Sequence, residues 1–111
     1  MNAAADHAPG KAFCVSVWYA PQSWVNADRD RASHAVEAIY DTARWANTHH
    51  DETLAILVRA GHLDATKLAG MSRTVYATSL TPGQIQPIID IAEQYKIFNK
   101  PVDAESIITT F

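Results

Sequence analysis

The segment Thr81-Pro82-Gly83-Gln84-Ile85-Gln86-Pro87-Ile88-Ile89-Asp90-Ile91-Ala92-Glu93-Gln94-Tyr95 carries the clearest structural signals of the chain. Thr81 is a typical N-cap residue, and Gln84 stands three positions later, where the partner of a capping box belongs. Pro82 occupies the first helical position, where a missing N–H costs nothing. Pro87 lies further inside, where it removes a backbone hydrogen bond and is expected to bend or restart the helix. The sequence therefore predicts a capped helix with an internal proline.

Helical periodicity also marks the middle of the chain. Asp28 is placed to cap a long helix that runs to about Asn47. Its apolar positions recur at helical spacing and are mostly alanine: Ala32, Ala35, Val36, Ile39, Ala43 and Ala46. The next helix is expected to run from Thr48 to about Ala60, where Gly61 is expected to end it in a left-handed conformation.

Shorter helical elements are expected on either side of these two helices. Residues 21–27 indicate a turn or a single helical turn. Asp64 is placed to cap a short third helix, and Asp103 to cap a last turn that extends to Ile107. Together with the Thr81–Tyr95 segment, these signals predict a mainly helical chain.

One convincing strand precedes the helices, from Phe13 to Tyr19 (FCVSVWY). The segment is rich in β-branched and aromatic residues, and both of its faces are apolar apart from Ser16. This pattern predicts a strand covered on both sides. Thr74 to Thr78 is a candidate for a short second strand. A lone strand is not stable, so the first strand requires a partner.

Length and composition describe a single globular domain. The chain has 111 residues, 48% hydrophobic and 19% charged, which is enough for one modest core. The net charge is -3 and no basic block occurs. The sequence therefore lacks the cluster of Lys and Arg that binding to nucleic acid requires. The longest apolar runs, Ala12–Val15 and Leu54–Val58, are too short to span a bilayer. Residues 1–11 lack the pattern of a signal peptide and are expected to be a flexible N-terminal segment before a domain over residues 12–111.

The polar residues offer little reactive chemistry. His49, His50, Asp51 and Glu52 form the densest set of metal-capable side chains. Adjacent histidines at a helix start diverge, and the spacing of three or four that a helical ligand pair needs is missing. A solvated helix junction is therefore favoured over a metal site. The sequence contains neither a Gly-x-Ser-x-Gly turn nor a glycine-rich phosphate loop, so no catalytic residue, cofactor or metal is expected.

Other residues remain open to more than one interpretation. The aromatic residues around the strand exit suit core packing, a protein interface or ligand stacking. The candidate interface comprises Phe13, Val15, Val17, Trp18, Tyr19 and Trp24. Arg73 is interpreted as a surface ion-pair partner in preference to an anion contact. Cys14 lies in an apolar run, which favours a buried, inert thiol.

Several fragments share their order and spacing with one family. These are Trp45–Asn47, Asp51–Leu57, Arg73–Ala77, Thr81–Asp90, Tyr95–Ile97 and Lys100–Ala104. In this order they resemble the C-terminal end of ABC-transporter solute-binding proteins of the nitrate/sulfonate/taurine class, to which thiamine-pyrimidine-precursor binders are similar. The resemblance covers nearly all of this chain but only part of a family member. His50 departs from it, because relatives often carry proline there.

The resemblance implies the C-terminal segment of a two-lobed, type II periplasmic-binding-protein α/β fold, here mainly α with one or two short strands. Such proteins are non-catalytic and periplasmic. They capture a small anionic or heterocyclic solute in the cleft between the lobes and deliver it to a membrane permease. The chain would then form part of such a protein, as a fragment or a truncated gene product. We assign no solute contact to a particular residue.

The sequence leaves two other functions open. The chain is alternatively a standalone helical interaction or structural domain, or an inactive fragment related to pyrimidine-precursor synthases. In isolation we expect homo-oligomers, in which the Phe13–Tyr19 strands pair across a two-fold axis.

Overall fold

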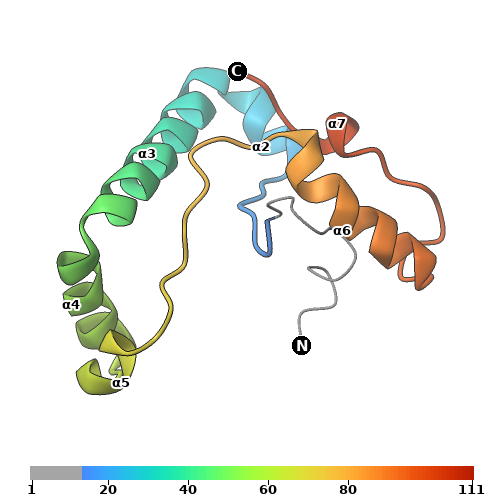
Figure 1. Cartoon of the computed structure of the whole chain (residues 1–111). Coiled ribbons are helices and arrows are strands. Elements are labelled where there is room, and N and C mark those ends of the chain that lie inside the picture. Colours follow the sequence, from blue (N-terminus) through green and yellow to red (C-terminus); the bar gives the residue numbers. More distant parts are fainter. Residues whose placement is uncertain (1–13) are drawn as a thin grey trace. The chain divides into compact units, whose positions relative to one another are not determined.

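The computed structural model describes residues 14–111, so the predicted flexible segment (residues 1–11) and Phe13 lie outside the described residues. Six helices are assigned in this part of the chain: α2 (Gln22–Ala27), α3 (Arg29–Thr48), α4 (His50–Gly61), α5 (Ala65–Ala69), α6 (Pro82–Gln94) and α7 (Ala104–Ile107) (Figure 1). The prediction of a mainly helical chain is confirmed. The described chain divides into two compact units, one comprising residues 14–29 and 79–111 and the other Asp30–Thr78, and each is described by itself.

Both strand predictions are wrong. Between residues 14 and 111 no segment forms a strand, and residues 16–20 and 72–77 run without regular secondary structure. A β-prone sequence becomes a strand only where a second strand supplies the backbone partners. No such partner lies beside either segment in the described chain.

Helix α6 follows the capping signals that its sequence carries. The Thr81 N–H donates to Oε1 of Gln84 at 2.7 Å, which completes the reciprocal capping box. The helix continues through Pro87, so of the two expected effects, a bend or a restart, the restart does not occur. The carbonyl that loses its partner belongs to Gly83, an exposed residue of the first turn. Water can satisfy that carbonyl, so the proline is tolerated here.

One glutamine joins α6 to α7, which pack against each other. The Gln86 amide nitrogen donates to the Val102 carbonyl at 3.1 Å and to Asp90 at 2.7 Å. Its oxygen accepts from the Ala104 N–H at 2.7 Å. Ala104 is fully buried, so this bond satisfies a donor that has no access to water. Asp103 caps α7 through the Glu105 N–H at 3.0 Å, as predicted.

The C-terminus of the same unit is held by Arg29. Its guanidinium donates to the Thr110 carbonyl at 2.8 Å and lies 5.4 Å from the centre of the Phe111 ring. A cation over an aromatic face adds about 0.5–1 kcal/mol at an exposed site. The last two residues are therefore fastened to the first residue of α3.

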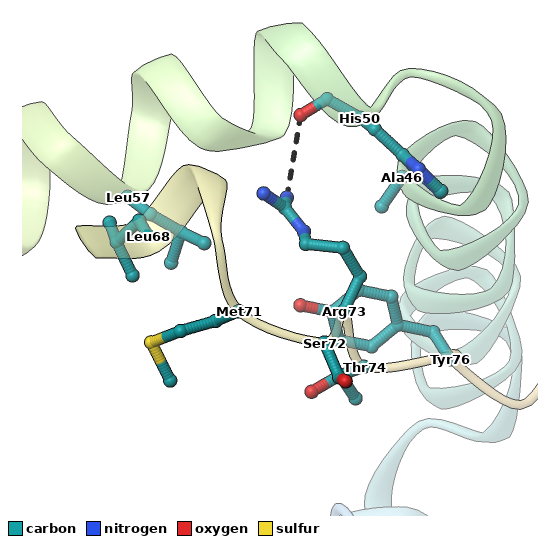
Figure 2. Close-up of a pocket in the computed structure, with 9 residues that line it drawn as sticks. All are labelled: Ala46, His50, Leu57, Leu68, Met71, Ser72, Arg73, Thr74 and Tyr76. Atoms are coloured by element: carbon teal, nitrogen blue, oxygen red, sulfur yellow. Dashed lines mark hydrogen bonds between the residues drawn. The ribbon is translucent and has the colours of Figure 1, made fainter. Parts of the chain in front are cut away.

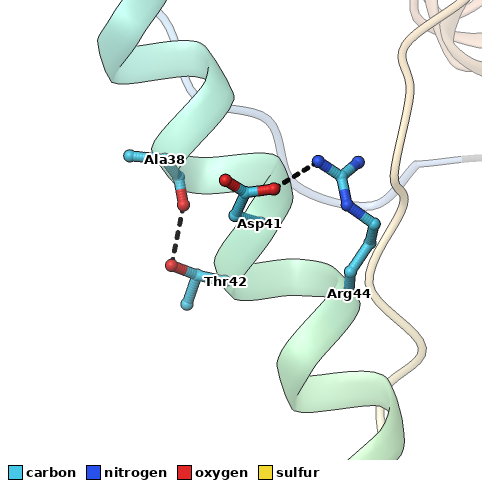
Figure 3. A network of polar contacts seen from close by, with 4 residues as sticks. All are labelled: Ala38, Asp41, Thr42 and Arg44. Atoms are coloured by element: carbon cyan, nitrogen blue, oxygen red, sulfur yellow. Dashed lines mark hydrogen bonds and ion pairs between the residues drawn. The ribbon is translucent and has the colours of Figure 1, made fainter.

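Helix α3 presents the predicted alanine stripe. Ala32 and Ala43 are buried and the other members of the stripe are half-buried, whereas His34 is exposed. The opposite face is polar (Figure 3): Thr42 donates to the Ala38 carbonyl at 2.7 Å, and Arg44 pairs with Asp41 at 2.5 Å. That ion pair is exposed and contributes at most about 1 kcal/mol. The two faces confirm the periodicity of the sequence.

The turn from α4 to α5 corrects one detail of the prediction. Gly61 is the last residue of α4, and the left-handed position belongs to His62, with φ of 51°. A Cβ on Gly61 would approach the Leu63 side chain to 3.1 Å, so a larger residue there would require that side chain to shift. Asp64 caps α5 as predicted, accepting from the N–H groups of Thr66 and Lys67. Helices α4 and α5 pack against each other.

Few apolar residues are buried in the described chain. They are Val25, Ala32, Ala43, Ile89 and Ala104. Most of them are alanines, and burial of a methyl group contributes far less than burial of a leucine or phenylalanine. Local hydrogen bonds at helix ends therefore carry an unusual share of the fold.

We predict that Gln86→Ala destabilises the unit that contains α6 and α7. The change removes the hydrogen bonds of the side-chain amide and leaves the buried Ala104 N–H without a partner, which costs about 1–3 kcal/mol. Urea unfolding followed by circular dichroism measures the loss, and hydrogen exchange of the Ala104 amide locates it.

Gln94→Ala is the matched control, because Gln94 is an exposed residue at the end of the same helix. Its effect on the free energy of unfolding should stay within about 0.5 kcal/mol. Equal losses for the two variants would contradict the role given to Gln86.

Candidate interaction surface and loop cavity

The segment that leads into α2 has no regular secondary structure and is weakly attached. The Cys14 N–H donates to the Gln84 carbonyl at 2.9 Å and ties the start of the segment to the first turn of α6. From residue 15 to residue 20, no backbone hydrogen bond to another described residue is present. The Pro21 carbonyl then accepts from Trp24 and Val25, which starts α2. Within the described chain, six consecutive residues therefore keep their backbone donors and acceptors available.

The side chains of this lead-in segment, residues 15–20, are exposed as well. Exposed fractions are 80% for Val15, 83% for Trp18 and 92% for Tyr19, and Val17 is 47% exposed. The predicted strand covered on both sides is thus wrong in its burial as well as in its pairing. The interpretation that Trp18 and Tyr19 pack in the core is wrong for the same reason. Cys14, expected to be buried, is half-buried.

Trp24 is the remaining member of the predicted interface. It lies on α2 and is 41% exposed, while its neighbour Val25 is 7% exposed and packs inward. The first turns of α2 thus anchor the lead-in segment through Val25. The described members of the candidate interface all expose apolar surface, and their role as an interface stays a prediction.

A second candidate site lies in the unit formed by Asp30–Thr78. A cavity of about 150 Å³ opens between the end of α3, α4, α5 and the loop that follows α5 (Figure 2). Its lining residues are Ala46, His50, Leu57, Leu68, Met71, Ser72, Arg73, Thr74 and Tyr76. Leu57, Leu68 and Met71 supply an apolar side, whereas residues 72–74 supply a polar one.

Arg73 does not form the predicted surface ion pair. Its guanidinium donates to Thr53 Oγ1 at 2.7 Å. It also donates to the His50 carbonyl at 3.4 Å (Figure 2). Both acceptors lie near the start of α4, and Arg73 itself is half-buried. The arginine therefore fastens the loop after α5 to the start of α4.

An asparagine fixes the other end of this loop. Nδ2 of Asn47 donates to the Tyr76 carbonyl at 2.8 Å, and the Tyr76 N–H donates to Oδ1 of Asn47 at 2.9 Å. The side-chain amide thus makes the two hydrogen bonds that a neighbouring strand would make. Sequence reasoning missed this clamp. Its only signal was a β-prone segment without a visible strand partner.

The histidine pair is divided between two environments. The His49 ring stacks on Trp45 with centroids 5.1 Å apart, and its Nδ1 lies 2.9 Å from the Trp45 carbonyl. His50 lines the cavity instead. Among residues 14–111, no three His, Cys, Asp or Glu side chains come together in a group able to hold a metal ion.

Comparisons with protein-family models, with curated proteins and with solved structures gave no match for this chain. In the described part of the chain, no helix combines the length and the apolar character needed to cross a membrane.

We predict that Asn47→Ala releases the loop around Tyr76. Loss of both amide hydrogen bonds should lower the hydrogen-exchange protection of the Tyr76 amide by about 5- to 100-fold. The control is Asn99→Ala, since Asn99 is exposed and makes no side-chain hydrogen bond in the described structure. Unchanged protection of Tyr76 in Asn47→Ala would contradict the clamp.

We also predict that Arg73 and Thr53 are energetically coupled. A double-mutant cycle with Arg73→Met and Thr53→Val should give a coupling energy of about 0.5–1.5 kcal/mol, measured by urea unfolding. The same cycle with Arg59→Met, at an exposed residue near the other end of α4, should give none. Equal coupling in the two cycles would show that the Arg73 contact is not specific.

Proposed function

We propose that this chain is a non-catalytic binding module, the C-terminal portion of the solute-binding component of an ABC importer. The solute class is that of nitrate, taurine and other small sulfonates, or a similar anionic or heterocyclic compound. The parent protein acts in the periplasm and hands its solute to a membrane permease. In this proposal the chain belongs to a type II periplasmic-binding-protein fold.

The observation that carries the proposal is the mismatch between exposed and buried apolar surface. Val15, Trp18 and Tyr19 are at least 80% exposed, whereas the largest buried side chains of the described chain are Val25 and Ile89. Isolated exposed apolar residues are ordinary, but several strongly exposed ones within one short segment favour a surface that another protein covers. This pattern suits a module that is completed by further protein, as the C-terminal portion of a two-lobed binder would be.

The helical order gives the proposal further support. The fragments that carry the family resemblance include Trp45–Asn47 near the end of α3, and Asp51 in the first turn of α4. The Thr81 capping box starts α6, and the Gln86 amide joins α6 to the Lys100–Ala104 segment. Two of the family-like fragments are thus joined by specific hydrogen bonds.

A standalone helical interaction domain is the second candidate. The helical character of residues 14–111, which contain no strand, favours it over an α/β module. The same exposed surface would then bind a protein partner unrelated to solute transport. An experiment that reads out solute capture separates the two candidates.

The test is complementation. A sulfonate- or taurine-binding protein of this class is expressed without its C-terminal helical region, and the present chain is added to it. We expect a one-to-one complex that regains solute binding, measured by calorimetry, while neither part binds solute alone.

Trp18→Asp should prevent the complex, because it places a charge in the surface to be covered. Val75→Asp is the matched control, since Val75 is 84% exposed and lies outside the lead-in segment. A chain that fails to join the truncated protein, or joins it without restoring solute binding, would overturn the proposal in favour of the helical interaction domain.

A further inference from the structure

We propose that the lead-in segment, residues 15–20, pairs with the same segment of a second copy of this chain, antiparallel and across a two-fold axis that passes through Val17. The inference does not rest on the solute-binding proposal. It follows from the backbone, the side chains and the charge of the segment itself.

The backbone of the lead-in segment is ready to pair. It has no regular secondary structure from residue 16 to residue 20, and it leaves the N–H and C=O groups of residues 15–20 without backbone partners in the described chain. Such a row of available groups is a template for strand addition. Pro21, which lacks an N–H, sets the end of the pairing segment. The ends are held as well, by the Cys14 bond to Gln84 and by α2.

Side-chain alternation restricts the register. In the strand that pairing would form, Val15, Val17 and Tyr19 would lie on one face, and Ser16 and Trp18 on the other. A shift of one residue would set residues of opposite faces against each other. A two-fold axis through Val17 sets Val17 opposite its own copy and Val15 opposite Tyr19. The axis then passes through the middle residue of the apolar face. Each such cross-strand pair contributes about 0.2–1 kcal/mol.

The absence of charge in the lead-in segment and its exposed apolar area favour a second copy of the chain as its partner. Residues 14–20 contain no charged side chain, so two identical segments meet without like-charge repulsion. The exposed fractions of Trp18, Tyr19 and Trp24 correspond to on the order of 400 Å² per copy, because aromatic side chains present about 150–250 Å² each. The exposed valines add to this available area, which stays below the roughly 800 Å² per partner of a standard interface and therefore suits a weak dimer.

Site-directed disulfide trapping tests the register. In a Cys14→Ser background, single cysteines are introduced by Val15→Cys, Ser16→Cys or Val17→Cys, and the proteins are oxidised mildly. Directly opposed residues have Cα atoms about 4.5–5.5 Å apart, within the range that a disulfide spans. For residues 15 and 16, the equivalent residues of the two copies are offset by about 13 and 7 Å along the strand.

We expect Val17→Cys to form the covalent dimer roughly tenfold faster than the other two variants, since only its geometry allows the bond. Equal rates for the three cysteines would overturn the register. All three side chains are exposed in the single chain, so accessibility alone does not produce the difference.

Sedimentation of the unaltered chain tests the association itself. We expect a dimer at high micromolar concentration, and Val17→Asp should raise its dissociation constant by roughly 100-fold by opposing two carboxylates at the axis. Val75→Asp should leave the constant unchanged. A monomer, or a dimer that Val17→Asp leaves intact, overturns this inference. A chain that stays monomeric yet complements the truncated solute-binding protein overturns it without affecting the proposed function.

Discussion

Two side-chain amides, one in each unit, fasten segments that lie far apart in the sequence. Gln86 bonds to the backbone of residues 102 and 104, and Asn47 bonds to both backbone groups of Tyr76. In both places an amide does what a second strand or a larger core does in other proteins. The fold relies on these bonds because its buried apolar residues are few and mostly small.

The same shortage of buried apolar groups shapes the surface. Trp18 and Tyr19 are exposed while most of the buried residues of the described chain are alanines, so most of the aromatic surface of this segment does not contribute to the core. The lead-in segment combines that exposed area with available backbone groups. In the proposed pairing, a second copy would satisfy the backbone groups, and its side chains would pack beside their cross-strand neighbours.

The cavity beside Arg73 has a different character. The Arg73 guanidinium is directed toward the start of α4, where the Thr53 hydroxyl and the His50 carbonyl accept its N–H groups. An arginine committed in this way positions a loop. The Asn47 amide holds the same loop further along, at Tyr76. Structural fastening therefore accounts for the interactions of both residues.

Helix ends could be predicted from local sequence, whereas strand formation and burial could not. Asp64, Thr81 and Asp103 start their helices as expected, because capping joins a side chain to backbone groups only two or three residues away. Whether residues 14–19 become a strand depends on a partner that the segment does not encode, and the described chain leaves the segment without regular structure and mostly exposed. The partners of Arg73 and Tyr76 lie 20 and 29 residues away in the chain. No local pattern reveals such contacts, because only folding brings those segments together.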